Sequence, residues 1–211
     1  MIDQDQNVGQ LIERVNQKHP DLVEFRLDTL RDPKALEAVA KKKTFPTIVT
    51  DKSTREPEHS RELLLSAADL GFEYVDIDLS TRSAKTTVEE VKSRGTHVIV
   101  SFHDLKATPS KNELVRILDS QTQLGADICK IVTTALHPRD NLTILEFVAN
   151  KNAETRLVSF AMGSLGIPSR ILSPLFGSEF TFAALDEEST TAQGQLSIDN
   201  LRAAWRLLGI Q

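Results

Sequence analysis

The chain has 211 residues, of which 40% are hydrophobic and 26% are charged, and its formal net charge is −5 at pH 7. This balance is typical of a globular protein with one sizeable core and excludes the strongly basic footprint of a nucleic-acid-binding protein. The single cysteine, Cys129, favours a cytoplasmic location, the polar start MIDQDQNVGQ is unlike a signal peptide, and no apolar run is long enough for a membrane span.

Amphipathic segments typical of helices alternate along the chain with apolar segments typical of buried strands. The first pattern is a helix at 7–18, before any strand. Strands are predicted at 23–30, 47–51, 74–79, 97–104, 126–135, 156–163 and 181–185, and the helices between and after them include 32–43, 60–71, 110–125 and 197–209. Strand starts recur about every 25–30 residues, as in βα units, and no linker interrupts them, so we expect a single domain over residues 1–211.

Side-chain alternation in two predicted strands helps to choose between folds built of βα units. In VEFRLD (23–28) and YVDIDL (74–79), apolar residues alternate with charged ones, which places the two kinds on opposite faces. A half-exposed antiparallel edge strand would give the same pattern. In a closed barrel, the apolar residues would face the helices and the charged ones would converge in the lumen, near the end where barrel active sites lie.

We therefore expect an α/β fold, a (β/α)8 TIM barrel, in preference to an open doubly wound sheet. The strands fall short of a complete barrel, because seven are predicted and the chain starts with a helix. The barrel is expected to lack its first N-terminal strand, unless the first residues of the chain replace it.

His103 and Lys130 are the side chains with the clearest chemical use. His103, in SFHDLKATP, ends a predicted strand, where a histidine suits general acid–base work because imidazole titrates near neutrality. Lys130 lies one strand later among apolar residues, in GADICKIV. Burial and nearby cations such as Arg26 and Arg170 would favour its neutral amine, which can form a Schiff base with a ketone.

Other interpretations of these residues stay open. A lone histidine more often serves as a hydrogen-bonding residue of the core, and Lys130 could form a structural ion pair with Glu24, Asp76 or Asp78. No metal site is expected, because the remaining histidines lack metal-ligand spacing and Cys129 has no cysteine partner. The segment MGSLG is only weakly similar to a phosphate-binding loop.

Taken in order, the motifs resemble those of class I 3-dehydroquinate dehydratase (type I dehydroquinase), an enzyme family of the shikimate pathway. The resemblance rests on EFRLD, DIDL, SFHDLKATP, GADICKIV, SFAMGSLGIPSR, FGSEFTFA and AQGQLSI. It implies a (β/α)8 barrel without a metal or an organic cofactor. It also implies a lyase (hydro-lyase, EC 4.2.1.10) that converts 3-dehydroquinate to 3-dehydroshikimate through a lysine Schiff base.

The resemblance further implies roles for individual residues. Lys130 corresponds to the Schiff-base lysine, and His103 to the histidine that takes a C2 proton and assists departure of the C1 hydroxyl. Arg170 corresponds to the arginine that holds the substrate carboxylate. The other substrate-binding positions are Glu24, Arg26, Lys52, Glu56, Met162, Thr191 and Gln195, and Phe160, like Met162, stands where the family usually has a methionine.

The chain also departs from the family's pattern. Lys52 stands where an arginine is common, so the charge is kept but the guanidinium fork is lost. Thr191 stands in place of a serine. Glu56 is followed by Pro57 in place of the usual glycine, so the loop around it is expected to differ.

Two alternative functions remain. One is a Schiff-base aldolase acting on a sugar phosphate, and the other is a catalytically degenerate barrel that serves as a binding or scaffold domain. The expected partner is the small-molecule substrate 3-dehydroquinate, with no nucleic acid and no membrane. A homodimer is compatible with the sequence, which does not fix the oligomeric state.

Overall fold

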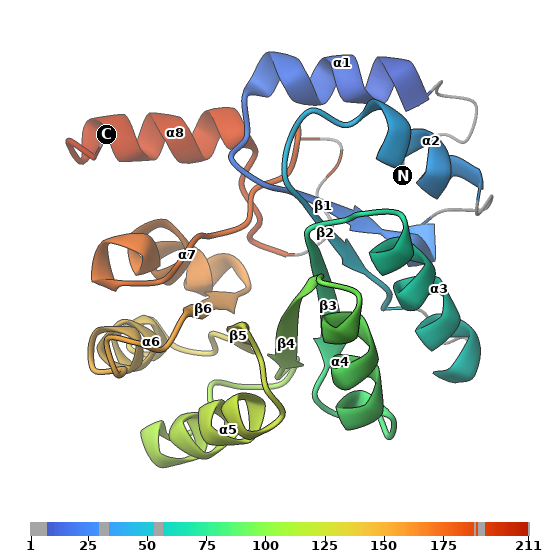
Figure 1. Ribbon diagram of the computed structural model, residues 1–211. Helices are drawn as coiled ribbons and strands as arrows, with labels where there is room; N and C mark the ends of the chain where they lie inside the picture. Colours follow the sequence, from blue (N-terminus) through green and yellow to red (C-terminus); the bar gives the residue numbers. More distant parts are fainter. Residues whose placement is uncertain (1–7, 30–33, 53–56, 188, 190–192, 211) are drawn as a thin grey trace. The chain divides into compact units, whose positions relative to one another are not determined.

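The computed structural model describes residues 8–29, 34–52, 57–187, 189 and 193–210. The chain divides into two compact units (Figure 1). The first unit comprises residues 1–100 and 124–126, and the second comprises residues 101–123 and 127–211.

The first unit consists of helices alternating with parallel strands. In chain order its elements are α1 (Val8–Lys18), β1 (Val23–Arg26), α2 (Lys34–Lys42), β2 (Thr47–Thr50), α3 (Pro57–Asp69), β3 (Tyr74–Asp78), α4 (Ala84–Ser93) and the first four residues of β4 (His97–His103). Figure 1 shows α3 and α4 packed beside each other against β3.

The two faces of this sheet confirm the alternation expected from the sequence. The register aligns Arg26, Thr50 and Asp76 in one row across β1, β2 and β3. The residues just before them, Phe25, Val49 and Val75, form the neighbouring row on the opposite face and are buried. There the Phe25 ring packs against the rings of Phe45 and Phe72, with centroids 6.5 and 6.4 Å away. In these two rows, the apolar and the charged side chains therefore lie on separate faces of the strands.

The second unit repeats the βα pattern. Its elements are the last three residues of β4, α5 (Lys111–Gln123), β5 (Ile128–Thr134), α6 (Asp140–Ala149), β6 (Leu157–Met162), α7 (Ile167–Leu172) and α8 (Ile198–Leu207). Helix α5 packs on β5, and α6 and α7 pack on β6 (Figure 1). Strands β5 and β6 are parallel, and Lys130, Val132 and Thr134 pair with Val158, Phe160 and Met162.

Most of the predicted elements are confirmed, with two corrections. The strand predicted at 23–30 ends at Arg26, and Leu27–Thr29 form a 3-10 helix. The strand expected at 181–185 is reduced to a single parallel bridge between Ala184 and Ser197. The Phe182 carbonyl accepts a hydrogen bond from the side chain of Arg170, whereas the Ala184 carbonyl accepts one from the backbone of Ile198. A segment whose carbonyls bond to such different partners does not form a regular ladder. The six other predicted strands are present within residues that the structure describes.

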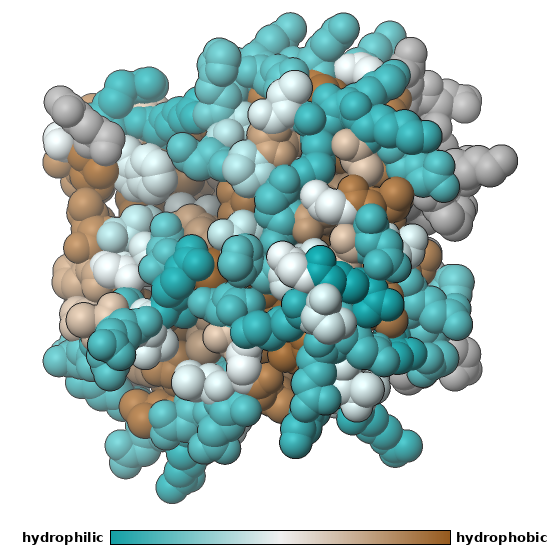
Figure 2. Space-filling model, viewed as in Figure 1, coloured by the Kyte–Doolittle hydropathy of each residue, from teal (hydrophilic) through white to brown (hydrophobic). Residues whose placement is uncertain are grey.

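Large exposed hydrophobic side chains are unevenly distributed over the described residues. All of them belong to the second unit, and four lie at the end of α8 or in the 3-10 turn after α7: Leu175, Phe176, Leu207 and Leu208. Figure 2 shows brown surface in this region, at the left edge of the view. In the described part of the chain, no helix has the length and apolar character required to span a membrane.

Candidate active site

The first unit carries a row of charged side chains at the ends of β1, β2 and β3. Arg26 donates two hydrogen bonds to Asp28, at 2.9 and 2.7 Å, and these hydrogen bonds together with the charge of Asp28 raise the pKa of Arg26. Glu24, two residues earlier on the same face of β1, accepts a hydrogen bond of 2.9 Å from the Thr50 hydroxyl. The predicted substrate-binding residues Glu24 and Arg26 therefore lie together, each oriented by a neighbouring side chain.

Lys52, just after β2, belongs to the same cluster of charges. Its ammonium nitrogen lies 3.2 Å from a carboxylate oxygen of Asp76 and 3.4 Å from one of Asp78. The Asp76 side chain is fully buried, so Lys52 supplies positive charge to a carboxylate that water does not reach. This pairing was not part of the sequence-based prediction, which gave Lys52 a contact with substrate.

His103 and Lys130 lie on neighbouring strands of the second unit. The backbone N–H of Asp104 donates to the carbonyl oxygen of Val132, at 2.9 Å, and in a parallel pair this bond sets His103 beside Val132. Lys130 is two residues before Val132 and therefore shares its face of the sheet. The histidine and the lysine thus occupy one face of the sheet.

Hydrogen bonds hold the segment after His103 in place. The Asp104 carboxylate accepts the backbone N–H groups of Lys106 and Ala107, at 2.8 and 3.0 Å, which closes a tight turn. The Thr134 hydroxyl, at the end of β5, donates to the Asp104 carbonyl at 2.9 Å. This turn therefore fixes the end of β4 against the strand that carries Lys130.

Lys130 is buried, with 5% of its surface exposed. Its ammonium nitrogen lies 4.4 Å from the centre of the Phe182 ring, a distance at which the ring face attracts a cation. The backbone of Lys130 is also held, because the buried Gln121 side chain donates to its carbonyl oxygen at 2.9 Å. The helix side of the strand thus fixes the backbone, and the opposite side places the amine on an aromatic face.

Arg170 is more deeply buried still, with 2% of its surface exposed. Its guanidinium carbon lies 4.2 Å from the centre of the Phe160 ring, and Nη1 donates to the Phe182 carbonyl at 3.1 Å. Nε has no hydrogen-bond partner, and no carboxylate among the described residues pairs with this cation. Burial lowers the pKa of Arg170 to about 10. A buried cation in this state is well suited to bind an anion.

A buried polar network fixes the position of α7, which carries Arg170 in its last turn. The backbone N–H of the adjacent Ser169 donates to the Asn141 side chain on α6 at 2.9 Å, and the Ser169 hydroxyl accepts the N–H of Ala161 on β6 at 3.0 Å. Gly166 lies so close to β6 that a Cβ atom at this position would overlap the backbone of Ala161. The helix can approach the strand only because the side chain is absent there.

Gln195 follows a turn that approaches the end of β6. The N–H of Gly163 donates to the carbonyl of Gln193 at 3.0 Å, and a Cβ atom on Gly194 would overlap the carbonyl of Gly163. The half-buried Gln195 is thereby held in the second unit, which also contains Met162, the last residue of β6. The predicted residues Glu56 and Thr191 lie outside the described residues.

Sequence reasoning missed the part played by Phe182. Its ring contacts Lys130, its carbonyl contacts Arg170, and its ring centroid lies 6.1 Å from that of Phe160. Phe180 extends this aromatic cluster, with its ring centroid 5.5 Å from that of Phe182. The period-two placement of phenylalanine at 180 and 182 was the available signal, because it puts both rings on one side of an extended segment.

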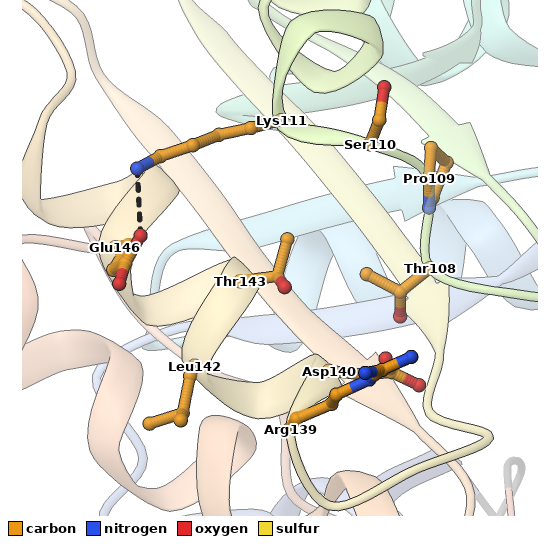
Figure 3. A pocket seen from close by; sticks show the side chains of 9 residues that line it. All are labelled: Thr108, Pro109, Ser110, Lys111, Arg139, Asp140, Leu142, Thr143 and Glu146. Atoms are coloured by element: carbon orange, nitrogen blue, oxygen red, sulfur yellow. Dashed lines mark hydrogen bonds and ion pairs between the residues drawn. The ribbon is translucent and has the colours of Figure 1, made fainter.

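A separate hollow lies on the second unit between the start of α5 and α6 (Figure 3). Lys111 and Glu146 form an ion pair of 2.7 Å across one side of it, and Arg139 and Leu142 line another part. None of the predicted site residues lines this hollow. Among the described residues, no group of three or more histidine, cysteine, aspartate or glutamate side chains is arranged to hold a metal ion.

A fold of parallel βα units with a buried lysine, and with a buried arginine that no described carboxylate pairs, is typical of an enzyme, because burying a cation costs stability. The sequence profile of Type I 3-dehydroquinase matches residues 1–211. The chain belongs to the Type I 3-dehydroquinase family, and its activity is that of a lyase of the hydro-lyase class.

Similar proteins support this assignment. A 3-dehydroquinate dehydratase of Pyrococcus abyssi is 33% identical over 213 residues, covering 96% of this chain and 94% of the relative. A 3-dehydroquinate dehydratase of Methanocaldococcus jannaschii is 36% identical over 201 residues, covering 90% and 89%. The crystal structure of 3-dehydroquinate dehydratase from Geobacillus kaustophilus matches with a TM-score of 0.86 and 27% identity, over 95% of this chain and 85% of that one.

Proposed function

We propose that this protein dehydrates 3-dehydroquinate to 3-dehydroshikimate through a Schiff base on Lys130, with His103 as the general acid and base. The observation that carries the proposal is the placement of Lys130 and His103 on one face of two neighbouring strands. The uncompensated guanidinium of Arg170, which contacts the same Phe182 as Lys130, supplies a site for the substrate carboxylate.

Covalent catalysis suits this substrate because its leaving hydroxyl is β to a ketone. The neutral amine of Lys130 attacks the C3 carbonyl, and uptake of one proton with loss of one water leaves an iminium ion. The iminium withdraws electrons from C2, so that His103 can remove a C2 proton and leave an enamine. The enamine then expels the C1 hydroxyl, which leaves as water with the proton returned by His103. Hydrolysis of the conjugated iminium consumes one water and releases the enone and the free lysine.

The aromatic face beneath Lys130 fits this sequence of charges. A ring face attracts a cation whether the charge is on an ammonium or on an iminium nitrogen. Phe182, 4.4 Å from the Lys130 nitrogen, therefore favours the iminium relative to a neutral amine. The steps as written need no metal and no organic cofactor, because the iminium itself takes up the electrons released at C2.

Substrate hydroxyls would be bound by Glu24 and Arg26, which Thr50 and Asp28 hold in fixed orientations. Met162 and Gln195 are proposed as further substrate contacts, and Glu56 and Thr191 are proposed as contacts on sequence grounds alone. Lys52 would bind the substrate while its ammonium group remains paired with Asp76 and Asp78. We further propose that the fold is of the (β/α)8 barrel type, which the similarity to solved dehydratase structures supports.

The proposal is tested by trapping the covalent intermediate. The protein is incubated with 3-dehydroquinate and borohydride, digested, and mapped by mass spectrometry, while the enone product is followed by its absorbance. We expect an adduct on Lys130 and no enone from Lys130→Ala. Lys111→Ala serves as the control, because Lys111 is half exposed and pairs with Glu146. An adduct elsewhere, or enone formation by Lys130→Ala at the wild-type rate, would overturn the mechanism.

His103 is tested separately from the lysine. In His103→Gln the amine remains, so the borohydride adduct is expected to form on Lys130 while turnover falls by about 10²–10⁴-fold. Loss of the adduct together with turnover would mean that His103 acts before the elimination. Turnover at the wild-type rate would remove it from the mechanism.

A further inference from the structure

We propose that Phe160 is a positioning residue whose ring face holds the guanidinium of Arg170 ready to bind the substrate carboxylate. The inference rests on the proposed function, since it takes Arg170 as the residue that binds this carboxylate. It assigns to Phe160 a function in substrate binding in addition to its packing in the core.

The contacts of Arg170 lead to this inference. The guanidinium carbon lies 4.2 Å from the centre of the Phe160 ring, and both side chains are almost completely buried. The Phe182 carbonyl accepts one of its hydrogen bonds, at 3.1 Å, and Nε has no acceptor. Besides this hydrogen bond, the electron-rich face of Phe160 is the interaction that compensates the charge of Arg170 among the described residues.

An aromatic partner suits an anion-binding arginine better than a carboxylate would. A carboxylate binds the edge of the guanidinium and occupies the N–H groups that lie in its plane. A ring contacts the face of the guanidinium and leaves those in-plane groups available. Phe160 thus stabilises the buried charge of Arg170 without competing for the donors that a ligand carboxylate needs.

The position of Phe160 on the sheet makes its hold on Arg170 rigid. Phe160 pairs with Val132 in the register of β5 and β6, between the Lys130 and Thr134 pairs. Its ring is therefore positioned by the pairing of β6 with β5 and by contact with the Phe182 ring, 6.1 Å away. The guanidinium is held from the strand side by Phe160 and from the following segment by the Phe182 carbonyl.

The test replaces Phe160 with phenylalanines that carry one, two or three ring fluorines. Fluorination keeps the shape of the ring and progressively withdraws electron density from its face, so packing is retained while the attraction for a cation weakens. The ligand is 3-dehydroquinate with its ketone reduced to a hydroxyl, which cannot form a Schiff base and reports on binding alone. We expect its Kd, measured by calorimetry, to rise with each fluorine and to reach about tenfold with three.

Two controls isolate the effect. The same fluorine series at Phe180, whose ring contacts Phe182 at 5.5 Å, is expected to leave the Kd unchanged. The carboxamide of the same ligand, which has no negative charge, is expected to bind weakly and without dependence on fluorination. A Kd that does not change along the Phe160 series, or that changes equally in the Phe180 series, overturns the proposal.

Turnover separates this inference from the proposed function. With 3-dehydroquinate as substrate, the Phe160 series is expected to raise KM while kcat changes by less than about twofold, because binding is altered and the chemical step is not. If the wild-type protein binds the reduced ligand but never turns over the ketone, the proposed function fails and the Phe160 series still decides this inference. If the wild-type protein does not bind the reduced ligand, both the proposed carboxylate site at Arg170 and the proposed role of Phe160 are wrong.

Discussion

The ammonium nitrogen of Lys130 lies 4.4 Å from the centre of the Phe182 ring, with Lys130 only 5% exposed. Burying an ammonium group costs free energy, because the charge loses its hydration, and apolar packing does not offset this cost. Replacing a catalytic residue is expected to abolish turnover without lowering the free energy of unfolding. Replacing a structural residue is expected to lower the free energy of unfolding. This difference can be measured.

Lys130→Met removes the charge and keeps a chain of similar length. We expect turnover to fall to the uncatalysed background, because no amine remains to form the Schiff base. The free energy of unfolding, measured by urea denaturation, is expected to stay within about 1 kcal/mol of the wild type or to rise. A loss of about 3–5 kcal/mol would instead indicate a buried ion pair, the alternative that the sequence left open for Lys130.

Arg170 is expected to separate binding from chemistry. Arg170→Lys keeps a cation but loses the planar fork, so KM should rise about tenfold or more while kcat falls less. The free energy of unfolding of Arg170→Met is expected to exceed that of the wild type by about 1 kcal/mol or more. The reason is that burial lowers the pKa of Arg170 to about 10, which means that the folded protein disfavours the charged form. A less stable Arg170→Met protein with unchanged KM would make Arg170 a structural residue.

The rows of charged and apolar residues in the first unit could be predicted because a strand has a period of two. Alternation in VEFRLD and YVDIDL was enough to place Arg26 and Asp76 on one face and Phe25 and Val75 on the other. Spacing could not reveal the partner of each charge. The pairing of Lys52 with Asp76 depends on the height of each residue along its strand, which the register alone determines.

In the second unit, too, the local sequence pattern predicted some features, whereas contacts between residues far apart in the sequence could not be predicted. Local pattern was sufficient to place His103 at the end of one strand and Lys130 within the next strand along the chain. The contacts of Phe182 were not predictable, because Lys130 lies 52 residues away in sequence and the two meet only after β5 and β6 have paired. The 181–185 segment also has a strand-like composition, yet one of its carbonyls bonds to Arg170 instead of a ladder.

Lys52 is expected to contribute to stability through Asp76. Lys52→Met would leave the fully buried Asp76 side chain without this counter-charge, and we expect a loss of about 2 kcal/mol or more in urea denaturation. Lys52→Arg, which keeps the charge, is expected to lose less than about 1 kcal/mol. The double variant Lys52→Met with Asp76→Asn measures the coupling between the two residues. Strict additivity in that cycle would show that the pair contributes nothing to folding.

Asp28 is expected to make stability depend on pH. Burial raises its pKa, but the hydrogen bonds and charge of Arg26 outweigh burial and the pKa ends below its usual value of 3.8. A carboxyl group whose pKa is lower in the folded state contributes stability that is present above the unfolded pKa and lost as the pH falls through the folded pKa. Asp28→Asn should therefore lower the free energy of unfolding at neutral pH by about 1 kcal/mol, with the difference shrinking below about pH 4.

Urea denaturation of both proteins between neutral pH and about pH 3 measures this difference directly. Asp119→Asn is the control, because Asp119 is exposed and far along the chain, on α5. Its difference from the wild type should not vary with pH in the same window. A constant difference for Asp28→Asn across the window would contradict the role given to Arg26.

Gly194 and Gly209 form a matched pair for testing the turn that precedes Gln195. Both have positive φ angles, +75° and +71°, so alanine at either position carries a similar backbone strain. A Cβ atom at Gly194 would overlap the Gly163 carbonyl, whereas a Cβ atom at Gly209 would have no heavy atom within 4 Å. Any additional effect of Gly194→Ala therefore measures the close approach of this turn to the end of β6.

We expect Gly194→Ala to push the turn away from Gly163 and to move Gln195 with it. In steady-state assays KM for 3-dehydroquinate should rise about tenfold, while kcat should fall less, because Lys130 and His103 lie on strands that the change does not touch. Gly209→Ala should keep the wild-type KM and lose about 1 kcal/mol or less of stability. Equal KM values in the two variants would mean that the Gly194 turn does not position Gln195 for substrate, and that the glycine is required only for the conformation of its own backbone.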